Sequence, residues 1–293
     1  MRANAPTPAG ALRALLDQPR LHVMPCCFDA LSARLVERAG FALTFMSGFA
    51  VSAARLALPD TGLVSYGEML DQGRNICGAV SIPVIGDADT GYGNAVNVKR
   101  TIAGYAAAGF ACAMIEDQVA PKRCGHTPGK QVVDRAEALA RVRAAVDARD
   151  EGAGILVMAR TDARATHGLD EALWRAEAFA DVGADVLFVE APTSRAEMER
   201  ICRVAHVPQM ANLVEGGDTP LLPAAELEAI GYRIAAHPLT LLSAGIAAMQ
   251  EALVELARGA APRERIAFAE LRKLVGFDAY DLEQARYAGK ETP

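Results

Sequence analysis

A ten-residue stretch, 121–130 (PKRCGHTPGK), combines a thiol, an imidazole and two lysines with glycine and proline. Glycine and proline at both ends exclude the interior of a helix or strand. The basic neighbours of Cys124 favour its thiolate, so this side chain can carry a proton or act as a nucleophile. A solvated basic loop with an incidental cysteine is the alternative for the stretch taken alone. The apolar run 111–115 precedes it and ends in acidic residues. This order predicts a loop at the carboxyl end of a strand, where enzymes with parallel sheets hold their active sites.

Carboxylates follow the neighbouring apolar runs. Asp87 and Asp89 open the segment 87–94 (DADTGYGN), and Glu116 ends the next apolar run. Joined by Asp60 from a loop, they suit a hard divalent cation such as Mg²⁺, with Mn²⁺ as a substitute. Zinc is less suited because no pair of His or Cys residues has its ligand spacing. An Asp pair that only caps a helix or forms a turn is the alternative reading.

Polar residues end most of the apolar runs, which a random scatter of polar residues would not do. They are Ser47, Asp87, Asp89, Glu116, Arg160, Glu190, Asn212 and His237. At a barrel mouth beside a metal site, Arg160 would bind a substrate carboxylate through two parallel hydrogen bonds, whereas elsewhere it would form an ordinary ion pair. For His237 a structural role in the rim is the favoured interpretation.

Short apolar runs alternate with longer, alanine-rich amphipathic segments along the chain, and these must position the polar residues. We expect strands at 21–25, 42–46, 82–86, 111–115, 155–159, 186–189, 209–211 and 232–236, and helices at 29–40, 50–56, 65–78, 94–108, 134–147, 169–182, 195–205, 224–230 and 239–258. Continuously apolar strands indicate a buried parallel sheet. Eight β-then-α units of this length predict a (β/α)8 TIM barrel, with a doubly wound open sheet as the runner-up. The barrel should occupy 1–260, and the amphipathic segment 261–293 has no obvious place in a single barrel.

Composition narrows the function classes. The 293 residues are about half hydrophobic and carry a net charge of −6, which argues for one large domain and against a nucleic-acid-binding surface. No apolar run is expected to reach the length of a membrane span. Residues 1–10 lack the apolar core of a secretory signal. The six cysteines show no metal-type spacing and predict reduced thiols in the cytoplasm.

Seven segments together resemble the isocitrate lyase/phosphoenolpyruvate mutase superfamily. They are 47–48 (SG), 58–60 (LPD), 87–93 (DADTGYG), 115–118 (IEDQ), 122–126 (KRCGH), 159–163 (ARTDA) and 212–217 (NLVEGG). The resemblance covers nearly the whole chain, and the KRCGH loop is its most specific part. It implies a barrel whose C-terminal helix is exchanged between subunits, so that helix-swapped dimers pair into a homotetramer.

The same resemblance implies the site residues. Asp87 would bind Mg²⁺ directly, and Asp60, Asp89 and Glu116 would bind it through water. The substrate would contact Ser47, Gly48, Phe45, Gly125, Arg160, Glu190 and Asn212. The catalytic set would be Cys124, His126, Lys122, Glu116 and Arg160, on or below a loop that closes over the site.

The chemistry implied is cleavage of a 2-hydroxy dicarboxylate. Deprotonation of the metal-bound hydroxyl drives a retro-aldol step to a 2-keto acid and the enolate of a second acid. Cys124 would protonate that enolate as general acid, with His126 and Lys122 tuning its thiol. By the same resemblance, the segments 45–49 and 212–217 imply a substituted malate, such as 2,3-dimethylmalate, over 2-methylisocitrate. Phosphonate chemistry and oxaloacetate hydrolysis at the same site are alternatives, as is a silent barrel that only binds a dicarboxylate.

Overall fold

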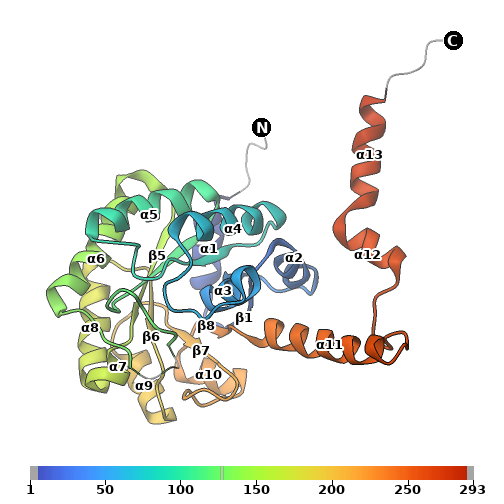
Figure 1. The fold of residues 1–293 in the computed structure, drawn as a ribbon. Coiled ribbons are helices and arrows are strands. Elements are labelled where there is room, and N and C mark those ends of the chain that lie inside the picture. The colour runs from blue at the N-terminus through green and yellow to red at the C-terminus, as the bar shows by residue number, and fades with distance from the viewer. Residues whose placement is uncertain (1–5, 126, 128, 289–293) are drawn as a thin grey trace. The chain divides into compact units, whose positions relative to one another are not determined.

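Eight parallel strands form the centre of the computed structural model, which describes residues 6–125, 127 and 129–288 (Figure 1). The strands are β1 (His22–Cys27), β2 (Thr44–Met46), β3 (Val84–Asp87), β4 (Cys112–Glu116), β5 (Leu156–Thr161), β6 (Val186–Val189), β7 (Met210–Asn212) and β8 (Ile234–His237). Their order is β6-β5-β4-β3-β2-β1-β8-β7. A parallel bridge between Leu187 of β6 and Gln209, next to β7, closes the ring. The predicted (β/α)8 barrel is thereby confirmed, and the open sheet is wrong.

One helix precedes the first strand, helices follow each strand in the chain, and further helices come after the barrel. They are α1 (Pro8–Leu16), α2 (Ala30–Arg38), α3 (Gly48–Leu56), α4 (Tyr66–Ala79), α5 (Ala95–Ala108), α6 (Arg135–Ala148) with the π-helical turn η1 (Arg149–Ala153), α7 (Ala163–His167), α8 (Leu169–Val182), α9 (Arg195–Arg203), α10 (Ala224–Ile230), α11 (Thr240–Ala257), α12 (Phe268–Val275) and α13 (Phe277–Tyr287). Helices α1 and α7 were not among the expected elements. Each helix expected from the sequence matches an observed helix to within a few residues at each end.

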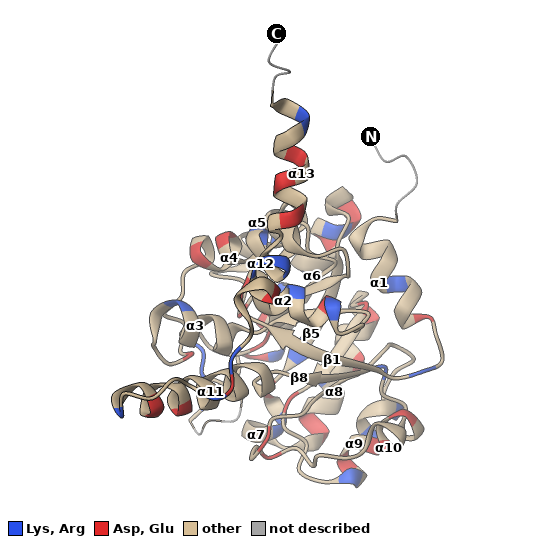
Figure 2. Cartoon of the chain, turned by 90° about the vertical axis from the view of Figure 1, so that its right-hand side faces the viewer, with Lys and Arg blue, Asp and Glu red and all other residues tan. Residues whose placement is uncertain are grey.

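Side-chain caps begin several of these helices. Asp29, the N-cap of α2, accepts a hydrogen bond from the Ser32 backbone N–H at 2.6 Å. Lys and Arg stand beside Asp and Glu along the outer helices (Figure 2). Some of these charges link neighbouring elements, as Arg135 of α6 does with Glu171 of α8.

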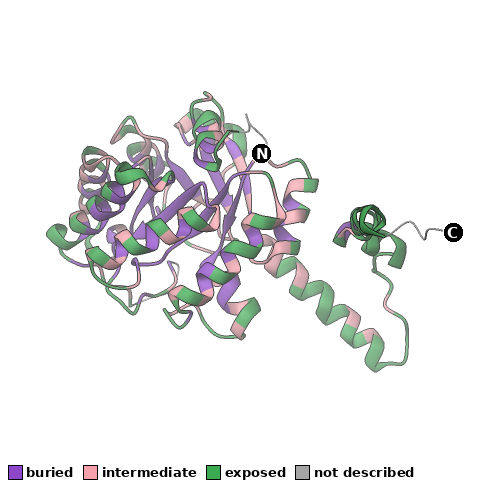
Figure 3. Cartoon of the chain, turned by 90° about the horizontal axis from the view of Figure 1, so that it is seen from above, coloured by how far each residue is buried: buried purple, intermediate pink, exposed green. Residues whose placement is uncertain are grey.

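Two layers of apolar side chains make the core. Most strand residues and the barrel-facing sides of the helices up to α10 are buried (Figure 3). Inside the barrel, Met24, Ile85 and Met158 pack together, and Leu12 and Leu16 of α1 join them. Because parallel strands are covered on both faces, they could be read as continuous apolar runs.

The chain divides into two compact units, Met1–Leu242 and Ser243–Pro293. The boundary lies inside α11, between residues 242 and 243. The boundary expected from the sequence was after residue 260. Helix α11, all 18 residues of which are described, has no buried residue and is long and apolar enough to cross a membrane. The expectation that no run reaches this length is therefore corrected. One such helix is weak grounds for a membrane, because helices that pack against protein have the same composition.

Candidate active site

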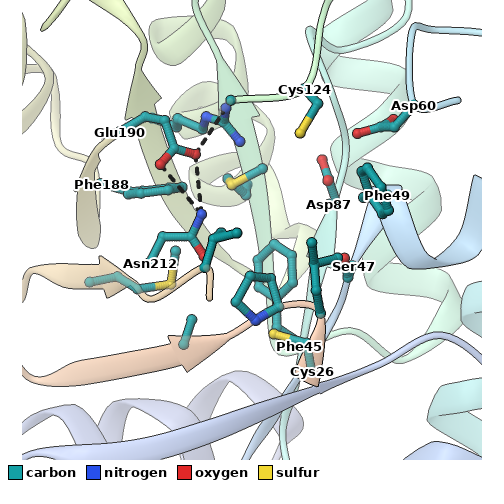
Figure 4. A pocket seen from close by; sticks show the side chains of 18 of the residues that line it. Cys26, Phe45, Ser47, Phe49, Asp60, Asp87, Cys124, Phe188, Glu190 and Asn212 are labelled. Carbon is teal, nitrogen blue, oxygen red and sulfur yellow. Dashed lines mark hydrogen bonds and ion pairs between the residues drawn. The ribbon is translucent and has the colours of Figure 1, made fainter. Parts of the chain in front are cut away.

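A cavity of about 220 Å³ opens at the carboxyl ends of the strands (Figure 4). Of the residues singled out from the sequence, those that line it are Phe45, Ser47, Asp60, Asp87, Lys122, Cys124, Gly125, Arg160, Glu190 and Asn212. Gly48, Asp89 and Glu116 lie behind this wall, in contact with residues that line it. The predicted site residues therefore gather at one end of the barrel, apart from His126, which lies outside the described residues.

The loop between β2 and α3 meets the end of β3. Ser47 is the N-cap of α3, and its hydroxyl accepts a hydrogen bond from the Ala50 N–H. The next residue, Gly48, donates its backbone N–H to Asp87 Oδ2 at 3.1 Å. A Cβ atom on Gly48 would lie 2.5 Å from the same oxygen. Only glycine lets the backbone approach the carboxylate this closely.

Asp87 is held in one orientation from several sides. Its Oδ1 accepts the Asp89 N–H at 3.0 Å, and Tyr105 donates its hydroxyl to the Asp87 carbonyl at 2.7 Å. Asp89 has a positive φ of 48°, which turns the chain back over the strand end. Burial, followed by the nearby charge of Asp89, raises the pKa of Asp87. A cation beside the pair would counter both effects.

Lys122 supplies a cation at this point. Its Nζ lies 2.6 Å from Asp60 Oδ1 and 3.0 Å from Asp89 Oδ1, and its side chain is buried. Burial lowers the pKa of Lys122, but the carboxylates around it outweigh this and raise the pKa well above its usual value. Lys122 is therefore a permanent positive charge facing the carboxylates. Its predicted influence on the Cys124 thiol stays a prediction.

Arg160 at the end of β5 is fixed by three carboxylates. Its Nε lies 2.8 Å from Asp162 Oδ2 and 3.4 Å from Glu116 Oε2, and one Nη lies 3.1 Å from Glu190 Oε2. Asn212 Nδ2 donates to both carboxylate oxygens of Glu190, at 3.4 Å from Oε1 and 3.3 Å from Oε2. The guanidinium thus has a set orientation at the cavity wall, which a ligand carboxylate could meet.

The loop that carries Cys124 lies over the cavity, and the Cys124 side chain points into it opposite Glu190 (Figure 4). The backbone N–H and hydroxyl of Thr127 donate to the Cys124 carbonyl at 3.0 and 2.8 Å. A Cβ atom on Gly125 would lie 2.3 Å from Glu190 Oε2 and 2.6 Å from an Arg160 nitrogen. The glycine therefore lets the loop seat directly on the charged wall of the site.

The acidic residues supply the oxygen donors that Mg²⁺ prefers. Within the described residues, no three His, Cys, Asp or Glu side chains already converge as a ready metal-binding cluster. Glu116 is buried, and its Oε1 has no hydrogen-bond partner among the described residues. Such an orphaned carboxylate oxygen is costly unless something pairs with it. By donor type and by this orphaned oxygen, the residues present fit a hard cation, and the individual ligands stay predictions.

Sequence reasoning missed two groups of residues. The first is the apolar wall, which consists of Cys26, Phe49, Met114, Phe188, Met210, Val214, Ala236, Pro238 and Leu239. Buried parallel strands are apolar on both faces, so no pattern in the sequence indicated which side chains face the cavity. The second is the pair Lys130 and Asp162, whose contact joins the loop to β5. Both were within segments already noted, but their contact depends on the tertiary structure.

Comparison with known protein families places the chain. The family model described as phosphoenolpyruvate phosphomutase matches residues 12–257. The chain is 45% identical over 248 residues to 2,3-dimethylmalate lyase of Eubacterium barkeri, which spans 85% of this chain and 84% of that protein. It is 40% identical over 282 residues to the chloroplastic carboxyvinyl-carboxyphosphonate phosphorylmutase of Arabidopsis thaliana, covering 94% and 83% of the two chains.

Solved structures give the same result. A crystal structure of 2,3-dimethylmalate lyase, a member of the PEP mutase/isocitrate lyase superfamily, superposes with a TM-score of 0.92 at 39% identity and covers 98% of this chain and 97% of its own. Oxaloacetate acetylhydrolase bound to 3,3-difluorooxalacetate has a TM-score of 0.92 at 35% identity, covering 98% and 99%. Phosphonopyruvate hydrolase with oxalate and Mg²⁺ has a TM-score of 0.86 at 31% identity, covering 97% and 100%.

Proposed function

Because the chain belongs to the phosphoenolpyruvate mutase/isocitrate lyase superfamily, we propose that it is a Mg²⁺-dependent lyase that cleaves an alkyl-substituted malate. Relatives of the chain that are themselves named lyases support an enzyme of the carbon–carbon lyase type. The products would be a 2-keto acid and a monocarboxylic acid. From 2,3-dimethylmalate, for example, cleavage between C2 and C3 gives pyruvate and propionate.

The reaction assigns work to the residues of the chain itself. Mg²⁺, held by Asp87 together with Asp60, Asp89 and Glu116, would acidify the substrate hydroxyl when bound. Arg160, held in place by its carboxylate partners, would bind a substrate carboxylate. Transfer of the hydroxyl proton to a carboxylate of the site turns C2 into a ketone as the C2–C3 bond breaks, and the electron pair goes to C3. Cys124 would then transfer its thiol proton to C3, while the loop keeps water away from the carbanion.

The observation that carries the substrate class is the apolar wall. Phe188 and Met210 of this wall line the cavity together with Phe45, and Phe188 lies across it from Asp60 and Asp87 (Figure 4). Methyl groups at C2 or C3 would lose water against these side chains at a gain of about 0.8 kcal/mol each. The cations among the described lining residues are Lys122 and Arg160, and both already contact carboxylates. A third substrate carboxylate would therefore face apolar carbon, which disfavours 2-methylisocitrate.

Two other reactions of the superfamily remain as competitors for the same site. The similarity to oxaloacetate acetylhydrolase supports oxaloacetate as a test compound. The similarity to the phosphorylmutase of Arabidopsis thaliana supports a phosphonate substrate. Oxaloacetate hydrolysis also leaves a carbanion that must gain a proton at carbon, so the thiol above the cavity fits it as it fits the lyase reaction, and the substrate panel separates the two.

The test is a keto-acid release assay with Mg²⁺, with EDTA-treated enzyme as the control. The panel contains 2,3-dimethylmalate, 2-ethylmalate, 2-methylisocitrate, isocitrate and oxaloacetate, with a phosphoenolpyruvate-type compound in a separate assay. We expect EDTA-sensitive keto-acid release from an alkylmalate and at least tenfold less from the tricarboxylates. Turnover of oxaloacetate or of the phosphoenolpyruvate-type compound alone would contradict the proposal.

We also propose cytoplasmic action and assembly as a homotetramer of helix-swapped dimers. The C-terminal unit supports the assembly, because large apolar side chains on it are exposed, among them Phe268, Tyr280 and Leu282. Exposed apolar surface of this extent is typical of a protein interface.

A further inference from the structure

The carboxylate of Asp162 is shared by two cations from different parts of the chain. Asp162 directly follows β5 and is fully buried. Its two oxygens accept from Arg160 Nε at 2.8 Å and from an Arg160 Nη at 3.0 Å. Lys130 Nζ lies 2.9 Å from Oδ1, the oxygen that also accepts from the Arg160 Nη. One buried carboxylate therefore contacts both the substrate-facing guanidinium and a lysine of the Cys124 loop.

Asp162 is itself fixed from behind. Its backbone N–H donates to Asp117 Oδ1 at 2.9 Å. Asp117 Oδ2 accepts from the Thr161 hydroxyl at 2.6 Å and from an Arg175 nitrogen at 3.0 Å. Because Asp117 directly follows β4 and Arg175 belongs to α8, two neighbouring elements hold the chain at Asp162. The carboxylate is therefore a rigid point in the site.

Lys130 ties the loop to this point. Besides Asp162, its Nζ contacts the carbonyl oxygen of Gly125, the residue next to Cys124. The Lys130 side chain is 4% exposed. If Gly125 moved away from Glu190 and Arg160, Lys130 would lose its contact with the Gly125 carbonyl. If Lys130 moved with Gly125 instead, Asp162 would lose one of its two cations. At the other end of the loop, Gln118 exchanges two hydrogen bonds with the backbone of Arg123.

We propose that Asp162 is a positioning residue that latches the Cys124 loop through Lys130 and, with the same carboxylate, orients Arg160 for the substrate. The contact of Lys130 with Asp162 holds the loop over the cavity, and the same carboxylate holds the guanidinium, so one residue positions both. The parts given to Cys124 and Arg160 rest on the proposed function. The latch itself rests only on the contacts of Lys130 and Asp162.

Hydrogen exchange of the full-length protein in Mg²⁺ buffer tests the latch without a substrate. Lys130→Met and Asp162→Asn should each speed amide exchange in residues 119–132 by about ten- to hundredfold, the range for a lost hydrogen bond to a charged group. The double variant should exceed Lys130→Met by no more than about twofold, because Lys130→Met alone already removes the contact between Lys130 and Asp162. Lys99→Met, which breaks an exposed pair with Glu151 on the barrel surface, is the matched control and should leave the loop unchanged.

Oxalate binding in Mg²⁺, followed by calorimetry, tests the orientation of Arg160. Asp162→Asn should weaken oxalate affinity at least tenfold, whereas Lys130→Met, which leaves Arg160 its contacts, should weaken it less. Loop exchange within twofold of wild type in Lys130→Met would overturn the latch, even if Asp162→Asn does not fold. Unchanged oxalate affinity in Asp162→Asn would overturn the role in orienting Arg160. If wild type cleaves no hydroxy acid, the proposed function fails while the exchange result still decides the latch.

Discussion

Gly48 shows how narrow the tolerances of the site are for a single residue. An added Cβ atom would lie 2.5 Å from Asp87 Oδ2, too close for any real contact. Gly48→Ala must therefore shift the carboxylate or the start of α3. We expect kcat/KM to fall about a hundredfold, as displacements of about 1 Å do in active sites. Steady-state kinetics measure this fall.

The matched control is Gly78→Ala in α4, where a Cβ atom would meet nothing within 4 Å. It should keep full activity. Equal activity of the two alanine variants would mean that Asp87 does not need its observed position.

Single residues could be predicted from the sequence only where their type is unusual for the position. Asp87, Glu116 and Arg160 could be recognised because a charge after an apolar run is costly unless it has a function or a partner. Phe188 and Asp162 could not be recognised. The inward direction of Phe188 depends on the closed barrel, and the contacts of Asp162 involve residues far apart in the sequence.

At the scale of the elements, Glu171 of α8 joins this helix to α6. Hydrogen bonds from Arg135, together with those from Arg175, lower the pKa of Glu171 to about 2 against the opposing effect of burial. The pair with Arg135 joins α6 to α8, and Arg175 continues inward to Asp117. Because the folded-state pKa lies below that of the unfolded chain, this stabilisation is complete above about pH 4.5 and disappears as the pH falls toward 2.

Glu171→Gln should therefore lower the free energy of unfolding at pH 7 by about 1 kcal/mol, after allowing for screening by solvent. The difference from wild type should shrink as the pH falls below 4.5. Urea unfolding at several pH values measures it. Glu177→Gln, at an exposed position of the same helix, should change little. A loss that is the same at all pH values would show that the charge of Glu171 is not the cause.

The expected elements agree with the structure except where packing, rather than local sequence, makes the helix. Helix α1 has nine residues, fewer than an isolated helix needs to be stable in water. It forms because Leu12 and Leu16 fill the end of the barrel beneath Met24 and Ile234. Helix α7, which follows the end of β5, has only five residues and is likewise too short to be stable by itself in water. The longer amphipathic helices carried their own periodic signal and could be predicted.

At the scale of the whole molecule, the barrel buries a large apolar core, whereas the C-terminal unit leaves most of its large apolar side chains exposed. Leu274 is buried there, whereas Phe268 is 74% exposed and Tyr280 is 65% exposed. The sequence predicted extra helices after the barrel, since their apolar positions recur with helical spacing. It could not show where the compact units divide, because the boundary lies within one continuous helix, α11.

Light scattering coupled to size exclusion tests the assembly. We expect a mass of about four chains for wild type and a smaller mass for Phe268→Glu combined with Leu282→Glu, because charges on an apolar interface oppose its burial. The exposed polar substitution Glu283→Gln on the same helix as Leu282 is the control. A monomeric wild-type protein would contradict the homotetramer and leave the exposed apolar residues without a partner.

The central claim is that Cys124 donates a proton to the carbanion formed by carbon–carbon cleavage. The most direct measurement compares keto-acid release by wild type, Cys124→Ser and Cys202→Ser on the preferred alkylmalate. Burial raises the pKa of Cys202 to about 12, and it does not line the cavity, so its variant should stay active. We predict that Cys124→Ser loses about 10²- to 10⁴-fold in kcat with unchanged circular dichroism and Mg²⁺ affinity. Full activity of Cys124→Ser would contradict the account.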